Sequence, residues 1–291
     1  MRGIVPGHRA VEGEHVADEQ QAEDGLDGTA VPPEINLNVP SIARVYDYVL
    51  GGKEHFEIDR RVSEALFKAV PETSQLAKDN RNHLRRAVRF LVESGITQII
   101  DLGSGLPTVG NVHEVAHEID PDVHVVYVDI DPIVLAHGRA LLGNETTTTV
   151  ITADVRDAAA IFDNPATHAL IDFDKPFAVI AASILHHFTD AEAYAAAEAI
   201  KSRLTPGSYI LMSNFLDDDE PRAKALERAF LEGGLGTGRF RTWSEQQRFF
   251  EGLELVEPGL VYANDWHPDD LTPTDSPTHT LYAAGVARKP S

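Results

Sequence analysis

The stretch Asp101-Leu102-Gly103-Ser104-Gly105 leads from an apolar run toward a helical pattern, and its residue types suit ligand binding. Gly103 and Gly105 let the backbone turn tightly and approach a ligand where a Cβ atom would collide. The free N–H groups at the start of the following helix add hydrogen-bond donors. A Gly-x-Gly alone is weak evidence, because ordinary turns between a strand and a helix also use glycine. Acidic residues after the next two apolar runs strengthen the interpretation of this loop as a ligand-binding loop.

Asp129 ends the second apolar run, 24 residues after Gly105. In a βαβ unit this position places a carboxylate where it accepts hydrogen bonds from ribose hydroxyls. Asp131 directly precedes Pro132, so it is the better N-cap for the helix that begins there. We therefore predict that Asp129 binds a ribose and that Ile130 and Asp131 line the same part of the site.

The third apolar run ends before Asp154-Val155. The Asp154 carboxylate can accept a hydrogen bond from the exocyclic amine of an adenine, while the Val155 N–H meets a ring nitrogen. A simple cap at a helix start is the alternative role for Asp154. The fourth run ends at Ala182-Ser183, which places small residues at the expected switch point of the sheet, with two histidines just beyond.

Asp101 distinguishes between two ligands that both contain adenosine, a dinucleotide and a sulfonium cofactor that carries an amino acid. A dinucleotide fold needs a third glycine to pass a pyrophosphate, but Thr108 holds that position and Asp101 would repel a pyrophosphate. A carboxylate at Asp101 suits an ammonium group. A sulfonium cofactor that carries an amino acid and an adenosine satisfies the three acids together, with Asp101 at the amine, Asp129 at the ribose and Asp154 at the adenine. A nicotinamide-dependent oxidoreductase is the less favoured alternative.

The elements that must position these residues alternate between β-rich runs and helical patterns from residue 97 onward. Such alternation, with nearly continuous apolar strands, predicts a parallel sheet covered on both faces. No helical pattern separates the last two strands, so the last strand is expected to pair antiparallel to its neighbour. We predict an α/β, Rossmann-like, doubly wound, mostly parallel seven-stranded sheet. The expected strands are Gln98–Leu102, Val123–Val128, Thr147–Thr152, Phe177–Ala182, Tyr209–Phe215, Leu253–Val261 and Thr280–Val286, and the expected helices are Val109–Ile119, Pro132–Leu142, Asp190–Leu204 and Glu220–Glu232.

Three helices are predicted before the first strand. The first begins after Pro40-Ser41 and ends at Gly51-Gly52, the second follows Asp59, and the third covers residues 74–94. The residues before them are rich in Glu, Asp, Gly and Pro and cannot bury enough apolar surface to fold. The predicted division is a disordered acidic tail over residues 1–38, a helical cap over residues 39–95 and the sheet domain over residues 96–291.

Composition restricts the partners and the chemistry. The chain has 46 acidic and 25 basic residues, a formal charge of -21, which disfavours nucleic acids and anionic membranes as partners. It has no cysteine, which excludes thiolate metal sites and a thiol nucleophile. No apolar run approaches the roughly 18 residues that span a bilayer, and we predict a cytoplasmic protein. No metal site is predicted, because Ser183 is not a hard anionic ligand and Asp217-Asp218-Asp219 is typical of a solvated loop.

The glycine loop and Asp129 resemble the class I S-adenosylmethionine-dependent methyltransferases, and this resemblance covers residues 98–215. More narrowly, the chain is similar to an actinobacterial S-adenosyl methyltransferase family formerly catalogued as a domain of unknown function. The motifs that carry this second resemblance are PSIARVYDYVLGGK at residues 40–53 and GLPT at residues 105–108, and it extends from about Pro40 to Lys289. It implies that S-adenosylmethionine is the cofactor, and it implies nothing about the acceptor.

We accordingly predict SN2 transfer of a methyl group to a small-molecule acceptor, accelerated mainly by positioning. If the acceptor is a hydroxyl, a base must remove its proton, and His186, His187, Tyr46 and Tyr48 are the candidates. Histidines that are neutral and packed are the commoner outcome.

The N-terminal helices are expected to form a lid, with Tyr46, Lys53 and Arg81 facing the cofactor.

Ala182-Ser183 replaces the Asp/Asn-Pro-Pro-aromatic motif of enzymes that methylate base amines, which favours small polar acceptors. The alternative function is a protein that binds S-adenosylmethionine without turnover. The acceptor atom, the oligomeric state and the pathway are left open by the sequence.

Overall fold

The computed structural model describes residues 36–107, 110–142 and 146–291. Most of the predicted tail, Thr108 and Val109 therefore lie outside the described residues. These described residues belong to one compact unit. No helix in the described ranges is long and apolar enough to cross a membrane.

A mixed sheet of eight described strands forms the centre of this unit, in the order β3-β2-β1-β4-β5-β8-β6, with β7 paired to β8. Strands β1 to β5 are parallel, and β8 is antiparallel to β5. The predicted fold class is confirmed. The strands are β1 (Gln98–Leu102), β2 (His124–Asp129), β3 (Thr148–Thr152), β4 (Ala178–Ala182), β5 (Tyr209–Phe215), β6 (Glu254–Leu255), β7 (Val261–Tyr262) and β8 (Tyr282–Arg288).

The end of the sheet differs from the prediction in one detail. The single strand expected over 253–261 is divided into β6 and β7, so the described sheet has eight strands instead of seven. Pro258 has no N–H to donate to a ladder, and Gly259 has a φ of 95°, which an extended strand does not use. The chain therefore turns between two short pairings with β8.

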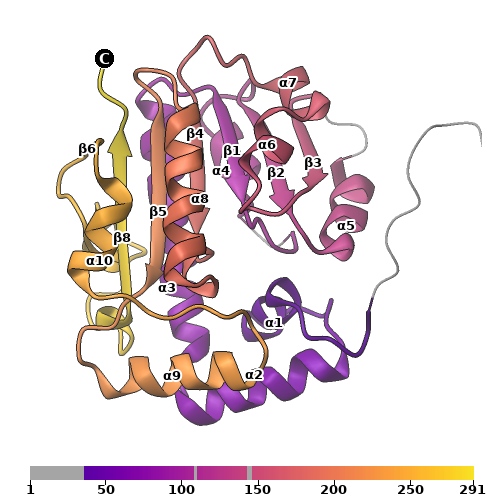
Figure 1. The fold of residues 1–291 in the computed structure, drawn as a ribbon, viewed down its shortest axis with the longest axis vertical. Helices are drawn as coiled ribbons and strands as arrows, with labels where there is room; N and C mark the ends of the chain where they lie inside the picture. Colours follow the sequence, from indigo (N-terminus) through magenta and orange to yellow (C-terminus); the bar gives the residue numbers. More distant parts are fainter. Residues whose placement is uncertain (1–35, 108–109, 143–145) are drawn as a thin grey trace, which may run out of the picture. The chain divides into compact units, whose positions relative to one another are not determined.

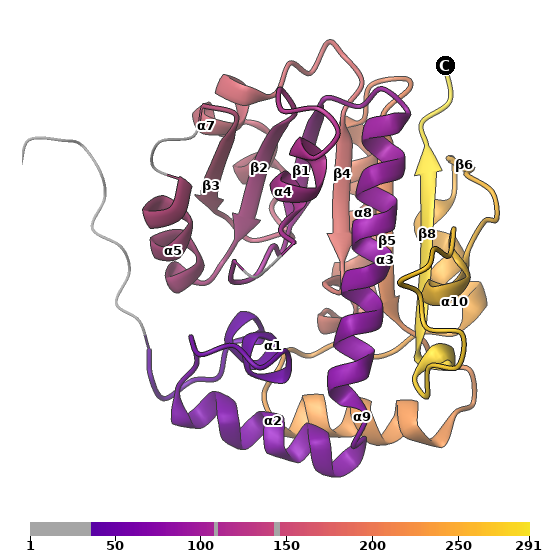
Figure 2. The same ribbon diagram turned by 180° about the vertical axis from the view of Figure 1, so that it is seen from behind.

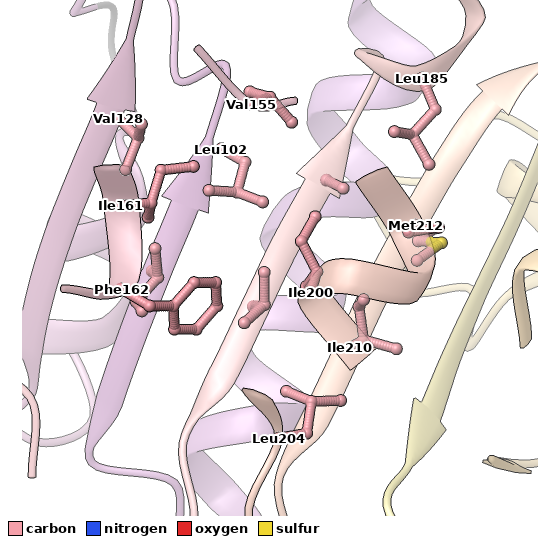
Figure 3. Packing of buried hydrophobic residues seen from close by; sticks show 14 of the residues in the cluster. Leu102, Val128, Val155, Ile161, Phe162, Leu185, Ile200, Leu204, Ile210 and Met212 are labelled. Carbon is pink, nitrogen blue, oxygen red and sulfur yellow. The ribbon is translucent and has the colours of Figure 1, made fainter. Parts of the chain in front are cut away.

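Helices cover both faces of the sheet. Figure 1 views the sheet from the side of α8, and Figure 2 views it from the side of α3 and α4. On the α8 side, Leu102, Ile161 and Ile200 belong to one continuous apolar core (Figure 3). The small helices α6, α7 and α10 are absent from the prediction. The helices are α1 (Ile42–Val49), α2 (Glu57–Ala69), α3 (Thr73–Glu93), α4 (Val112–His117), α5 (Pro132–Leu142), α6 (Ala158–Phe162), α7 (Pro165–Leu170), α8 (Asp190–Arg203), α9 (Pro221–Glu232) and α10 (Trp243–Gln247), with 3-10 turns η1 (Leu185–His187), η2 (Arg248–Phe250), η3 (Ala263–Asp265) and η4 (His279–Leu281).

Helices α1, α2 and α9 lie beyond the carboxyl ends of the parallel strands, and α3 runs from this group along one face of the sheet (Figures 1 and 2). Val62 and Leu66 of α2 pack with Leu226 of α9 and with Val45 of α1 in one apolar cluster. The expected N-terminal helices are thus present, and α9, from the second half of the chain, packs with them. Their position brings them to the edge where the predicted ligand residues lie.

Candidate active site

The glycine loop follows β1 and is held against the end of β2. The N–H groups of Gly103 and Ser104 donate to the Val128 carbonyl at 2.8 and 3.1 Å. The Gly105 N–H donates to Oδ2 of Asp129 at 2.8 Å, and the Asp131 N–H donates to Oδ1 at 2.9 Å. Burial raises the pKa of Asp129. The predicted ribose acid and the glycine loop therefore form one hydrogen-bonded unit.

The neighbours of Asp129 have distinct surroundings. Ile130 is a large apolar side chain that is 63 % exposed, which leaves an apolar surface beside the loop. Asp131 accepts a hydrogen bond from the Ile133 N–H at 2.9 Å, so it caps α5 as its position before Pro132 predicts. Asp154 is paired with Arg156, whose Nη1 is also 2.7 Å from Glu192, and the hydrogen bond from Arg156 lowers the pKa of Asp154.

Asp101 is buried on the face of the sheet that α3 and α4 cover. Burial raises the pKa of Asp101 to about 7; the positive charge of Arg81 opposes this rise and Asp129 adds to it. Arg81 also donates from Nη2 to the carbonyl of Gly110 at 3.0 Å, beside the glycine loop. A buried carboxylate and a guanidinium thus lie together at the end of β1.

Two local features of the glycine loop concern its unpaired polar atoms and its packing. The Ser104 Oγ is buried and has no hydrogen-bond partner in the described part of the chain. Gly103, at a φ of 66°, has no room for a side chain, because an added Cβ would lie 2.8 Å from Ile184 Cδ1. The segment after β4 therefore lies directly against the glycine loop. The loop, the three acids and the partnerless hydroxyl fit an amino-acid-bearing adenosine ligand.

Helix α1 is joined to this loop by packing and by charge. Ala43 of α1 shares an apolar cluster with Leu106 of the loop and Ile133 of α5. The buried Arg44 Nε lies 3.3 Å from Asp59 Oδ2 and 3.8 Å from Asp131 Oδ2. The first cap helix therefore contacts both the glycine loop and the segment that follows the ribose acid.

The motif residues of α1 have structural partners. The Tyr46 hydroxyl donates to the Ala77 carbonyl at 3.1 Å and accepts from Asn80 Nδ2 at 3.3 Å, and burial raises its pKa. Asp47 accepts from the Glu54 N–H at 2.9 Å, and a Cβ on Gly52 would lie 1.9 Å from Asp47 Oδ1. Lys53 is exposed in the turn after α1.

Residues 28–290 match the model of the S-adenosyl methyltransferase family. The chain belongs to this family. The solved structure of a candidate methyltransferase from Thermobifida fusca is similar with 46 % identity and a TM-score of 0.85, over 89 % of this chain and 98 % of that chain. A DUF574 family protein from Streptomyces avermitilis is similar with 35 % identity and a TM-score of 0.83, over 88 % of this chain and 100 % of that chain. The comparison with curated proteins gives no match. The cofactor of this S-adenosyl methyltransferase is S-adenosylmethionine.

The methyltransferase holds both predicted histidines inside an aromatic cluster. The ring centroids of His186 and Phe215 are 4.3 Å apart, and His186 Nδ1 accepts a hydrogen bond from the Phe215 N–H at 3.4 Å. His187 donates from Nδ1 to the Leu235 carbonyl at 2.7 Å. Burial lowers the pKa of His187 to about 4 and that of His186 well below its usual value. Both imidazoles are therefore neutral near pH 7.

Three polar residues that the sequence did not predict lie at the same edge of the methyltransferase sheet. The Ser213 hydroxyl, on β5, donates to Asn80 Oδ1 at 2.8 Å, which ties β5 to α3. The hydroxyl of Tyr282, the first residue of β8, hydrogen-bonds to the hydroxyl of Ser183. The predicted antiparallel last strand was the available signal for Tyr282, because such a strand begins where its parallel neighbours end.

Proposed function

We propose that this S-adenosyl methyltransferase transfers the methyl group of S-adenosylmethionine to a small-molecule acceptor at the carboxyl ends of β1, β4 and β5. The observation that carries the proposal is the succession of Asp101, Asp129 and Asp154 at the ends of neighbouring strands β1, β2 and β3. Asp101 would hold the ammonium group, Asp129 the ribose hydroxyls and Asp154 the adenine amine, with Arg81 near the amino-acid end.

The remaining predicted cofactor residues complete this arrangement. The backbone of Gly103, Ser104 and Gly105 and the exposed Ile130 side chain would line the ligand, with Ile130 against the flat adenine. Val155, Ala182 and Ser183 would border it from the ends of β3 and β4. Asp131 and Tyr46 would act indirectly, through the cap of α5 and the hydrogen bond to α3. Lys53 would lie at the exposed rim of the site.

The bound cofactor supplies a methyl group on a positively charged sulfur, which an aligned nucleophile can attack directly. The chain's contribution is then to orient the two reactants and exclude water, which accounts for most of the acceleration in such reactions. Tyr46 keeps its proton near pH 7, and His186 and His187 are weak bases because burial lowers their pKa values. These groups support an acceptor that needs no strong base, and a catalytic role for any of them stays a prediction.

Calorimetric titration with S-adenosylmethionine, S-adenosylhomocysteine and NAD tests the cofactor part of the proposal. We expect the first two to bind and NAD to fail, and the reverse order would contradict the proposal. A screen of small acids, phenols and amines with methyl-labelled S-adenosylmethionine then tests transfer. A protein that binds without turnover remains the second candidate, favoured by the weak basicity of the two histidines, and label in any product would exclude it.

A further inference from the structure

The sheet order and the proposed contacts of the three acids together give a position for the sulfur of the bound cofactor. With the adenine at the end of β3, the ribose at β2 and the amine at β1, the proposed ligand is laid out along consecutive neighbours in the sheet. The sulfur joins the ribose to the amino acid, so in this layout it lies between the ends of β2 and β1, at the glycine loop. Strand β4 is the other neighbour of β1, and the close approach of Ile184 to Gly103 shows that the segment after β4 lies against this loop.

Ser183, which directly follows β4, has an unusual backbone conformation. Its φ is 64°, in the left-handed region that residues other than glycine rarely occupy. Its N–H donates to the Ser213 carbonyl at 2.8 Å, so the neighbouring strand fixes this conformation. Strain of this kind persists where the surrounding structure imposes it and is concentrated at functional sites.

The Ser183 hydroxyl has a buried partner. It hydrogen-bonds to the hydroxyl of Tyr282. The ring centroids of Tyr282 and Phe215 are 4.7 Å apart. Burial raises the pKa of Tyr282 well above its usual value, so its hydroxyl stays neutral. Two neutral hydroxyls thus meet beyond β4, on the side of the glycine loop away from Asp129 and Asp154.

We propose that the paired hydroxyls of Ser183 and Tyr282 contact the sulfonium methyl group and form the wall of the acceptor site beside it. This inference rests on the proposed function. A methyl group on a positively charged sulfur carries polarised C–H bonds, which interact favourably with oxygen lone pairs. Tyr282 would be a residue that touches the reacting group, although it lies 99 residues from Ser183 in the sequence.

The test compares ligands that differ at the methyl position. S-adenosylhomocysteine lacks the methyl group, and sinefungin carries an ammonium group in its place. In Tyr282→Phe we expect the affinity for sinefungin to fall at least tenfold, because its ammonium loses a hydrogen-bond acceptor. The affinity for S-adenosylmethionine should fall about twofold to fivefold, and that for S-adenosylhomocysteine by less than about twofold.

Matched variants keep the test decisive. Tyr262→Phe is the control, because the Tyr262 hydroxyl donates to Asp218 at 2.8 Å on the exposed side of β7, and all three affinities should be unchanged. If Tyr282→Phe does not fold, Ser183→Gly removes the other hydroxyl and adopts a φ of 64° without strain. The same order of losses is expected for it.

The outcomes separate this inference from the proposed function. Equal losses for the three ligands, or an unchanged affinity for sinefungin, would mean that the hydroxyl pair does not face the methyl group. A wild-type protein that fails to bind S-adenosylmethionine would contradict the proposed function itself. Isothermal titration of the full chain at one pH measures all of these affinities.

Discussion

The Asp129 carboxylate accepts a hydrogen bond from the backbone N–H of Gly105 at 2.8 Å. Its second oxygen accepts from the Asp131 N–H at 2.9 Å. The proposed ribose acid therefore shapes both the glycine loop and the start of α5. A substitution at Asp129 must affect the architecture of the loop as well as the binding of a ribose.

Asp129→Ala is expected to weaken S-adenosylmethionine binding by roughly 1.5–3 kcal/mol, the scale for a charge-assisted hydrogen bond. It should also lower the free energy of unfolding by about 1–3 kcal/mol, because one buried and one partly buried N–H group lose their acceptor. Titration calorimetry and urea denaturation measure the two effects. The control is Asp157→Ala, which removes a helix cap that accepts from the Ala160 N–H at 3.0 Å. Unchanged affinity in a folded Asp129→Ala protein would make the ribose assignment wrong.

Asp101→Asn should stabilise the protein without ligand at pH 8 relative to wild type. The pKa of Asp101 is about 7 in the folded protein, against about 3.9 in an unfolded chain. A group whose folded pKa is raised contributes stability below its unfolded pKa, and this contribution is lost as the pH rises from about 4 through 7. The variant lacks this loss, so its free energy of unfolding, measured by urea denaturation, should exceed that of wild type by more at pH 8 than at pH 5. A difference that does not grow with pH would contradict the raised pKa of Asp101.

The same carboxylate should make cofactor affinity depend on pH. An ionised Asp101 is needed to hold the ammonium group, so wild-type affinity should rise as the pH increases toward 7. It should fall again above about pH 8, where an α-amino group loses its proton. Asp101→Asn should lose the rise below pH 7. Titrations from pH 5.5 to 9 check this profile, and an identical profile in the variant would place the ammonium group elsewhere.

The site residues that the sequence predicts lie at the ends of strands. Local pattern and chain order are enough to predict such positions. Asp101, Asp129 and Asp154 each follow an apolar run, and parallel strands bring their carboxyl ends to one edge. The pairs Ser183 with Tyr282 and Asn80 with Ser213 are separated by 99 and 133 residues. Their proximity depends on β8 entering the sheet beside β5 and on α3 crossing β5, and no local periodicity specifies either. The sequence predicts a helix over Glu220–Glu232, but the packing of this helix with α1 and α2 depends on tertiary contacts.

Gly52→Ala should be more destabilising than Gly51→Ala, although only Gly51 has a positive φ, at 85°. Gly51 has open space around an added Cβ, so its substitution costs only the left-handed conformation, about 1–2 kcal/mol. A Cβ on Gly52 would displace Asp47 from the Glu54 N–H and from His55 Nδ1, at a cost of about 2–4 kcal/mol. Adding Asp47→Ala to Gly52→Ala should cause little further loss. Additive effects in this double-mutant cycle, measured by urea denaturation, would contradict the proposed clash.

Arg44→Met should weaken the docking of helix α1 on the glycine loop and on the start of α5. Arg44 is buried; besides its contacts with Asp59 and Asp131, it donates from Nη2 to the Val39 carbonyl at 2.6 Å. Methionine retains the apolar stem but leaves two buried carboxylates without their cation. Breaking a buried ion pair in this way costs about 3–5 kcal/mol of stability. We expect the affinity for S-adenosylmethionine to fall as well, at least tenfold, because α1 packs on Leu106 of the glycine loop.

Arg61→Met is the matched control for this last prediction. Arg61 pairs with Glu57 on the surface of α2, where both side chains are 68 % exposed, and such pairs contribute little. Its removal should change stability by less than about 1 kcal/mol and leave cofactor affinity unchanged. If Arg44→Met loses stability but binds S-adenosylmethionine as tightly as wild type, the cap is a structural element outside the cofactor site. If both fall together while Arg61→Met remains normal, the docking of α1 through Asp131 is part of how the protein holds its cofactor.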